Sequence, residues 1–258
     1  TQNEKPRCSF NLDWIKKVCF RAKLAPSSVN RFNCKLTVEQ TGQNSLFMPS
    51  DFGQDITVKN DRMCVSVNRE TGLLENYTVD GNYLYQCYDA GATHQITTRN
   101  KVEMNHIRYS NNLIEYCVYG IEYFLDQLDG ESESCMENVE MCGNIIRLSG
   151  YGWGQQRHNT HTPAHIKGWS YENTARDFSV HENLFDRSAY RMLHLVARDP
   201  ESCPSLYGNT YVQTLGGMLG QYGGNREAEP PVISFDGDAE RVLTEEWGER
   251  EPTVYGVE

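Results

Sequence analysis

Short stretches in which apolar and polar residues alternate recur along the middle of the chain. The four clearest are Tyr77-Thr-Val-Asp80, Ile107-Arg-Tyr-Ser110, Val139-Glu-Met-Cys142 and Phe178-Ser-Val-His181. Strict alternation is typical of a β-strand with one buried face. The pattern therefore predicts a series of short strands and no helices in this region.

An asparagine follows each alternating stretch, and a second short strand is predicted directly after it. The asparagines are Asn82, Asn112, Asn144 and Asn183, separated by 30, 32 and 39 residues. Each is followed at its second position by an apolar residue, namely Leu84, Ile114, Ile146 and Phe185. Weaker copies centre on Asn60 and Asn209. Self-similarity at such a period indicates a repeat architecture.

A third strand is predicted after a turn in each copy. These strands begin at Gly91-Ala-Thr-His-Gln, Gly120-Ile-Glu-Tyr-Phe, Gly152-Trp-Gly-Gln-Gln and Arg191-Met-Leu-His-Leu, which aligns Ala92, Ile121, Trp153 and Met192 as buried positions. Three short strands per repeat fit a coil that climbs one strand spacing, about 4.8 Å, per turn. The predicted fold class is all-β, a parallel β-helix solenoid.

The repeats divide the chain into three predicted parts. Residues 51–228 form the rungs, residues 1–50 form an irregular capping segment, and residues 229–258 form a C-terminal cap with a short helix and a strand. Within the rungs, the Asn side chains tolerate left-handed backbone and are expected to stack in a hydrogen-bonded column. The alternative is that the asparagines mark unrelated turns. The glycine-rich stretch 216–225 is expected to form turns that close the last rungs.

The net charge and the lack of long apolar runs limit the classes of partner that are expected. The formal net charge of −11 argues against a nucleic-acid backbone and disfavours a strongly acidic polysaccharide. No apolar run is long enough to span a bilayer, so no membrane partner is expected. The oligomeric state stays open.

Cysteine usage and the N-terminus bear on the compartment. The nine cysteines include no CxxC pair, and an odd number cannot all pair within the chain. They are expected to be reduced, buried side chains, which favours a cytoplasmic location. The chain begins at Thr1 with neither an initiating Met nor a signal peptide, and secretion is the alternative if the N-terminus was trimmed.

Candidate chemistry gathers on the third strands, which are the most polar and aromatic part of each copy. Asp89 and Glu122 would lie on adjacent rungs, where two carboxylates can act as general acid and nucleophile, or as acid and base around a water. Sugar rings suit such a face because they offer an apolar side and a rim of hydroxyl groups. The predicted substrate-binding residues are His94, Gln95, Tyr119, Trp153, Gln156, Arg157, His165 and Lys167, with Trp169 just beyond them.

Alternatives to this interpretation stay open. The two carboxylates are equally expected to cap turns, and a bound Ca²⁺ is the alternative cofactor at the same pair, although no cofactor is predicted. His158, His161 and His165 form a run with metal-ligand residue types, but Pro163 interrupts it. A polar loop is therefore favoured over a metal site.

Three segments carry a resemblance to a known family: residues 85–95, residues 111–124 and Asn-Leu-Phe-Asp-Arg-Ser at 183–188. They resemble right-handed parallel β-helix proteins of the pectate-lyase-like superfamily, and more narrowly bacterial β-helix proteins similar to glycoside hydrolases. The resemblance covers about residues 55–225. It implies catalytic acids on one parallel sheet and its loops, which Asp89 and Glu122 match by position. A non-catalytic carbohydrate-binding or fibre-like module, or a polysaccharide lyase, is the alternative.

Overall fold

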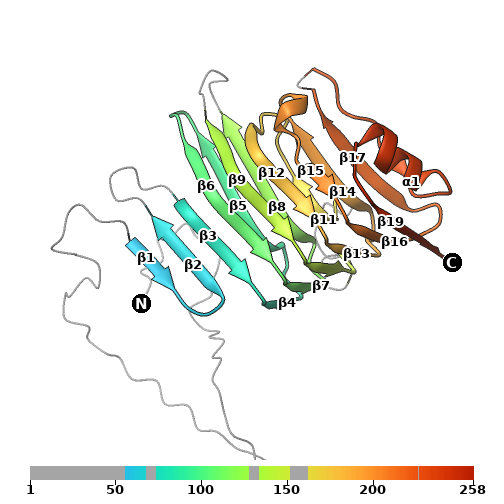
Figure 1. The fold of residues 1–258 in the computed structure, drawn as a ribbon, viewed down its shortest axis with the longest axis horizontal. Helices are drawn as coiled ribbons and strands as arrows, with labels where there is room; N and C mark the ends of the chain where they lie inside the picture. The colour runs from blue at the N-terminus through green and yellow to red at the C-terminus, as the bar shows by residue number, and fades with distance from the viewer. Residues whose placement is uncertain (1–55, 68–73, 128–133, 152–161, 226) are drawn as a thin grey trace, which may run out of the picture. The chain divides into compact units, whose positions relative to one another are not determined.

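The computed structural model describes residues 56–67, 74–127, 134–151, 162–225 and 227–258, all within the compact unit Ser50–Glu258. These residues are mostly β-strand and form three sheets, A, B and C (Figure 1). The predicted capping segment, residues 1–50, lies outside the described residues. No helix in the described part of the chain is long and apolar enough to cross a membrane.

Fifteen of the described strands form five consecutive sets of three, and each set, which we call a coil, gives one strand to each sheet. Coil 1 contains β3 (Leu74–Asp80), β4 (Tyr83–Tyr85) and β5 (Ala90–Thr98); coil 2 contains β6 (Glu103–Ser110), β7 (Leu113–Glu115) and β8 (Tyr119–Gln127). Coil 3 contains β9 (Cys135–Cys142), β10 (Ile145–Arg147) and β11 (Ala164–Gly168); coil 4 contains β12 (Ala175–His181), β13 (Leu184–Asp186) and β14 (Arg191–Ala197). Coil 5 contains β15 (Ser205–Tyr207), β16 (Thr210–Thr214) and β17 (Met218–Gly224).

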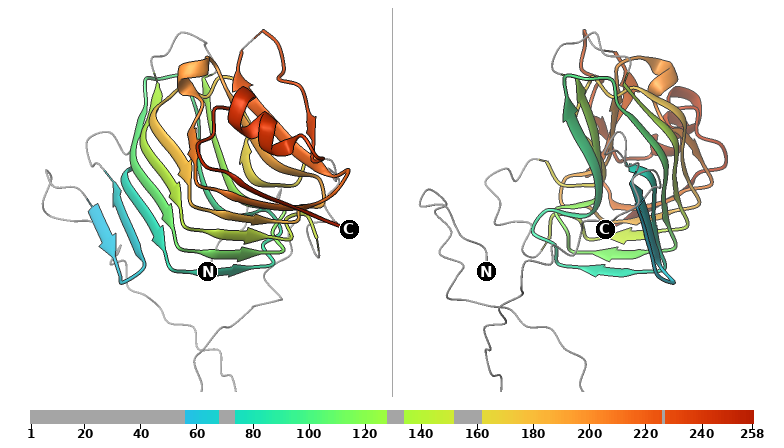
Figure 2. Two further views of the ribbon diagram at one scale, coloured as in Figure 1. Left: turned by 45° about the vertical axis from the view of Figure 1, so that its right-hand side comes forward. Right: turned by 90° about the vertical axis from the view of Figure 1, so that its left-hand side faces the viewer.

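Strands of successive coils pair in parallel in all three sheets. Sheet A takes β3, β6, β9, β12 and β15 in that order, sheet B takes β4, β7, β10, β13 and β16, and sheet C takes β5, β8, β11, β14 and β17. Figure 2 shows the coils stacked one on the next. Residues 26 to 45 positions apart in the chain (Val180 and Leu206, Ile121 and Ile166) therefore become direct neighbours.

Different elements extend the two ends of this stack. At the first coil, β1 (Ile56–Lys59) and β2 (Met63–Val67) continue sheet A as antiparallel strands. At the last coil, β18 (Ile233–Ser234) pairs antiparallel with β17, and β19 (Thr253–Val257) joins sheet B beside β16. The predicted C-terminal helix is short: α1 (Ala239–Arg241) continues directly into a π-helical turn, Val242–Glu246.

The predicted repeat around Asn60 is wrong. Asn60 lies in the hairpin turn between β1 and β2, where its Oδ1 accepts hydrogen bonds from the backbone N–H groups of Arg62 and Met63, both at 2.8 Å. Asparagine favours such turns because its side chain bonds to nearby backbone N–H groups. This local bond accounts for Asn60 without a repeat.

The apolar positions after the asparagines form one continuous column in the core. On sheet B, Leu84 pairs with Ile114, Ile114 with Ile146, and the column continues through Phe185 to Tyr211. Apart from Leu84, which is half-buried, these side chains are at most 1% exposed. The predicted alignment of Leu84, Ile114, Ile146 and Phe185 is confirmed.

The asparagines form the predicted column between sheets A and B. The backbone N–H and the Nδ2 group of Asn112 both donate to Oδ1 of Asn144, at 3.1 and 2.9 Å. Asn82, Asn144 and Asn183 donate in the same way to the asparagine of the next coil. Asn209 belongs to the column as well and donates to Oε1 of Glu249 at its end.

Each amide also binds the sheet A strand of the preceding coil. The Nδ2 groups of Asn112, Asn144, Asn183 and Asn209 each donate to a carbonyl oxygen of sheet A. Each of these side chains therefore satisfies two buried backbone groups of the preceding coil, the N–H of its asparagine and a C=O of its sheet A strand. Polar groups that leave water must find such partners, since an unpaired buried group costs about 1–3 kcal/mol.

The third strand of coil 3 lies twelve residues later than the sequence predicts. The prediction starts it at Gly152, whereas β11 is Ala164–Gly168, with Ile166 paired to Ile121 and Leu193. The predicted alignment of Trp153 and Met192 with Ile121 is therefore wrong. The connection from β10 to β11 is longer than its equivalents in the other coils, which a fixed offset from the asparagine does not allow for.

The glycine-rich stretch forms a strand, although turns were predicted. Met218–Gly224 is β17, paired in parallel with β14. Glycine is required there by a close approach of backbone, because a Cβ on Gly220 would lie 1.8 Å from the carbonyl oxygen of Leu193. Gly220 also has a φ of +136°, which side chains rarely allow.

We predict that Asn144→Ala lowers the free energy of unfolding by at least about 2 kcal/mol, because it removes the side-chain partners of the buried Asn112 N–H and Tyr109 C=O groups. Chemical denaturation monitored by circular dichroism measures the effect. Asn105→Ala is the matched control, since the Asn105–Asn138 pair is exposed and its loss should cost less than about 0.5 kcal/mol. Equal losses in the two variants would contradict a structural role for the column.

Candidate functional site

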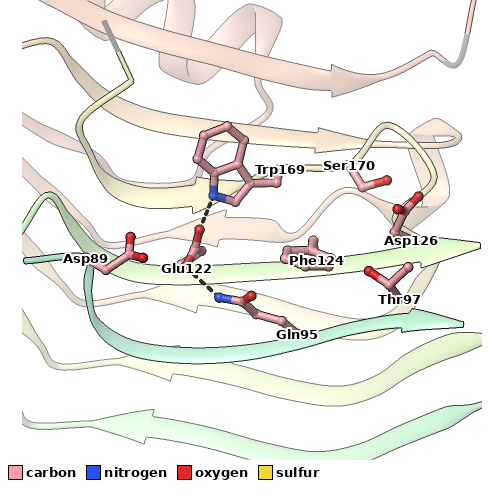
Figure 3. A pocket seen from close by; sticks show the side chains of 8 residues that line it. All are labelled: Asp89, Gln95, Thr97, Glu122, Phe124, Asp126, Trp169 and Ser170. Carbon is pink, nitrogen blue, oxygen red and sulfur yellow. Dashed lines mark hydrogen bonds between the residues drawn. The ribbon is translucent and has the colours of Figure 1, made fainter. Parts of the chain in front are cut away.

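A pocket of about 520 Å³ opens on the outer face of sheet C, over coils 1 to 3. Its lining residues come from β5, from β8 and from the turns beside them, as Figure 3 shows. They are Asp89, Gln95, Thr97, Glu122, Phe124, Asp126, Trp169 and Ser170. Both predicted catalytic carboxylates, Asp89 and Glu122, line this pocket.

Glu122 is held in place by donors from the coils on either side. Its Oε2 accepts a hydrogen bond of 2.6 Å from Nε2 of Gln95 in β5, and its Oε1 accepts one from Nε1 of Trp169, just after β11 (Figure 3). The side chain is 6% exposed. Two N–H donors stabilise negative charge on this carboxylate, because charge-assisted hydrogen bonds are stronger than neutral ones.

Two further carboxylates flank Glu122. Asp89 lies in the turn before β5, and Asp126 lies four residues beyond Glu122 on β8; Figure 3 shows them at opposite ends of the pocket. Asp126 was not among the predicted site residues. Its signal is in the sequence, because Glu122, Phe124 and Asp126 alternate along one strand and so share a face.

Trp169 provides the largest aromatic surface of the pocket. Its ring meets Tyr119 edge-on at a centroid distance of 5.5 Å, and the Tyr119 hydroxyl is 2.7 Å from Oγ1 of Thr162. Tyr119 itself is buried, so it supports the Trp169 ring rather than lining the pocket. The aromatic role predicted for Trp153 concerns a residue outside the described part of the chain, as do the roles of Gln156 and Arg157.

Lys167 lies beneath Trp169 and beside Glu122. It pairs in register with Glu122 of β8 and His194 of β14, and its Nζ lies 4.3 Å from the centre of the Trp169 ring. Burial lowers the pKa of Lys167 to about 7, and Arg191 contributes in the same direction, whereas Glu122 and Glu229 oppose the change. Lys167 is 3% exposed and supports the pocket from below.

The row of paired residues formed by Glu122 and Lys167 on sheet C continues to His194 of β14. Nδ1 of His194 donates to the carbonyl oxygen of Gly168 at 2.6 Å. Burial, together with the positive charges of Lys167 and Arg191, lowers the pKa of His194 to about 3. His194 is therefore neutral at physiological pH and adds no positive charge beside Lys167.

Two histidines predicted to bind substrate lie in the core. His94 stacks on Tyr123 at 5.8 Å with its Nδ1 2.9 Å from the Tyr109 hydroxyl, and His165 has its Nδ1 2.9 Å from the Ser149 hydroxyl. They are 2% and 0% exposed, and burial lowers the pKa of each to about 3. The structure does not bring them to the pocket. Alternation along β5 turns His94 to the face opposite Gln95, whereas His165 is directed into the core, where its ring stacks on Phe185 at 5.7 Å.

The described cysteines are free and at least half-buried. They are Cys64, Cys87, Cys117, Cys135, Cys142 and Cys203. Burial raises the pKa of Cys117 to about 12, and the neighbouring thiol of Cys87 is among the other influences on it. Cys117 therefore behaves as a small packing side chain, as predicted.

Comparisons of the chain with protein-family models, with curated proteins and with solved structures found no match.

The lowered pKa of Lys167 predicts a free energy of unfolding that rises with pH between about 7 and 10.5. In this interval folded Lys167 is mostly neutral while the unfolded residue still binds a proton, so each rise in pH favours the folded state. Below about pH 7 both states are protonated and the contribution is constant.

Chemical unfolding of the wild type and of Lys167→Met at several pH values separates the contribution of Lys167 to the unfolding free energy from that of other titrating groups. The difference in unfolding free energy, wild type minus variant, should increase from pH 7 to pH 10. A difference that stays constant over that interval would contradict the assignment.

Proposed function

We propose that this chain is a right-handed parallel β-helix that binds a glycan in the sheet C pocket and hydrolyses a glycosidic bond with Asp89 and Glu122. The fold part of the proposal is supported by three sheets visited in turn and by a column of asparagines that links the coils. An elongated sheet face of this kind presents a continuous surface to a polymer.

The observation that carries the functional part is the lining of the pocket. Trp169 and Phe124 offer apolar surface, and Gln95, Asp89 and Glu122 supply polar groups around it. This combination suits a sugar ring, whose apolar face packs on aromatic side chains while its hydroxyl groups meet amides and carboxylates. Three carboxylates in one pocket, together with the net charge of −11, favour a neutral oligosaccharide or polysaccharide over an acidic one.

The two carboxylates suit different tasks. Glu122 is fixed by two donors and nearly buried, which suits the group that stabilises or attacks the developing sugar cation. Asp89 is exposed in a turn at the end of the pocket, where it has access to solvent for proton exchange. It therefore suits the proton donor to the leaving oxygen.

A non-catalytic glycan-binding role is the second candidate, favoured by a specific observation. Both oxygens of Glu122 already accept hydrogen bonds, from Gln95 and from Trp169. A carboxylate used in this way can orient the Trp169 ring as a sugar platform without taking part in chemistry. The two candidates share the same ligand and differ only in turnover.

The test is a screen of the full chain against neutral oligosaccharides, with products identified by mass spectrometry. We expect Glu122→Gln and Asp89→Asn each to lower kcat at least about 100-fold while leaving the fold unchanged. Asp126→Asn is the matched control: it removes the same charge from the same pocket and should retain most of the activity.

Other results would separate the alternatives. Unchanged turnover in both catalytic variants would refute the assignment of Asp89 and Glu122. Binding that is lost in Trp169→Ala, without hydrolysis of any glycan tested, would favour the binding module. Unsaturated products that require Ca²⁺ would identify a lyase instead.

A further inference from the structure

A second group of reactive side chains lies on sheet A, away from the sheet C pocket. Parallel pairing of β6, β9, β12 and β15 aligns Ser110, Cys142, His181 and Tyr207 in one column. Glu140 lies two residues before Cys142 on the same strand. One ligand atom each from Glu140, Cys142 and His181 lie within 4.8 Å of one another.

Carboxylates face both nitrogens of the His181 ring. Nε2 is 3.1 Å from Oε1 of Glu140, and Nδ1 is 3.1 Å from Oε2 of Glu182. A neutral imidazole carries only one N–H, so it can donate to only one of the two acceptors. The arrangement is favourable only when a cation, either a second proton or a metal ion, lies between the ring and one of the carboxylates.

The charges around the cluster balance with a divalent metal. Arg108 bonds to the outer oxygen of Glu140, with Nε 3.0 Å from Oε2, and its Nη2 is 3.7 Å from Sγ of Cys142. Glu140, Glu182 and a Cys142 thiolate supply three negative charges, and Arg108 supplies one positive charge. A divalent ion then brings the group to neutrality.

The His181 ring is also oriented for coordination. It stacks on Tyr207 with ring centres 4.2 Å apart and planes 10° from parallel. Glu182 bonds to Nδ1, which leaves Nε2 directed at Glu140 and Cys142. A carboxylate on the far nitrogen of a histidine is the usual partner of a metal-binding imidazole, since it fixes the ring and raises its basicity.

We propose that Glu140, Cys142 and His181 bind a divalent transition-metal ion of the zinc class, with Oε1, Sγ and Nε2 as ligands. One nitrogen, one sulfur and one oxygen suit Zn²⁺ or Co²⁺, whereas Ca²⁺ and Mg²⁺ prefer oxygen alone. Three protein ligands leave a fourth position for water or a small ligand. Glu182 and Arg108 act as positioning residues.

Cys142 must lose its proton to bind the metal ion as a thiolate. Burial raises the pKa of Cys142, while the hydrogen bond from Arg108 acts in the opposite direction. A bound metal ion converts the thiol to its thiolate and releases the proton.

The experiment uses the full chain, reduced with a phosphine, stripped with a chelator and titrated with Co²⁺. A thiolate-to-cobalt charge-transfer band should appear and should saturate at one Co²⁺ ion per chain. The Cys142→Ser and His181→Gln variants should lack this band. Cys135→Ser is the matched control, since Cys135 lies in the same strand and is also buried. This control should keep the band.

A further variant keeps the proposal testable if Cys142→Ser or His181→Gln fails to fold. Glu182→Gln changes an exposed side chain whose Oε2 lies 3.1 Å from the far nitrogen of His181, and it should weaken Co²⁺ affinity about 10- to 100-fold. Addition of Zn²⁺ should raise the melting temperature of the wild type more than that of this variant. A cobalt band that is absent, or that persists in folded Cys142→Ser, would overturn the proposal.

Discussion

The asparagine column is the interaction on which the stacking of the coils depends. Each Oδ1 receives two N–H groups from the coil before, and Nδ2 donates to a sheet A carbonyl and to the next amide. Such a column cannot end on another amide without leaving one set of donors unpaired. Glu249 ends it, because a carboxylate only accepts: Oε1 receives both donors of Asn209, and Oε2 receives the Tyr211 hydroxyl. Burial raises the pKa of Glu249, and these hydrogen bonds oppose the change.

Register follows from this column, and the pocket follows from register. Once Asn112 is fixed above Asn82, β8 pairs with β5 so that Glu122 lies beside Thr93 and Phe124 beside Gln95. The next coil brings Lys167 beside Glu122 and Trp169 within reach of its carboxylate. A slip by one residue would turn each of these side chains to the opposite face. The pocket therefore has no independent scaffold and depends on the core amides.

The repeat in the sequence predicted the features that recur at a constant distance from the asparagines. The column that begins at Leu84 belongs to this class, because each of its members lies two residues after an asparagine. Asp89 and Glu122 were located by the order of the strands, since one lies just before the third strand of coil 1 and the other in the third strand of coil 2. The same method failed at coil 3, where the longer connection after β10 changes the offset, so the third strand begins at Ala164 and Trp169 follows it into the pocket. It also failed for His94 and His165, since residue type suggested chemistry for two side chains that are buried in the core. The need for glycine at Gly220 could not be predicted, because it arises only from the close approach of the Leu193 backbone in the folded chain.

The sheet C pocket and the cluster of Glu140, Cys142 and His181 on sheet A differ in how their charges are balanced. This difference suits them to different ligands. On sheet C, Glu122 lies beside a lysine whose pKa is lowered to about 7, so Lys167 offsets the charge of Glu122 only in part at neutral pH, and Asp89 and Asp126 add to the negative charge of the pocket. On sheet A, two carboxylates face one imidazole and a thiol lies alongside, which leaves a demand for a cation. The pocket and the cluster lie on different sheets and share no side chain. Loss of Cys142 should therefore leave glycan binding intact, and loss of Glu122 should leave metal binding intact.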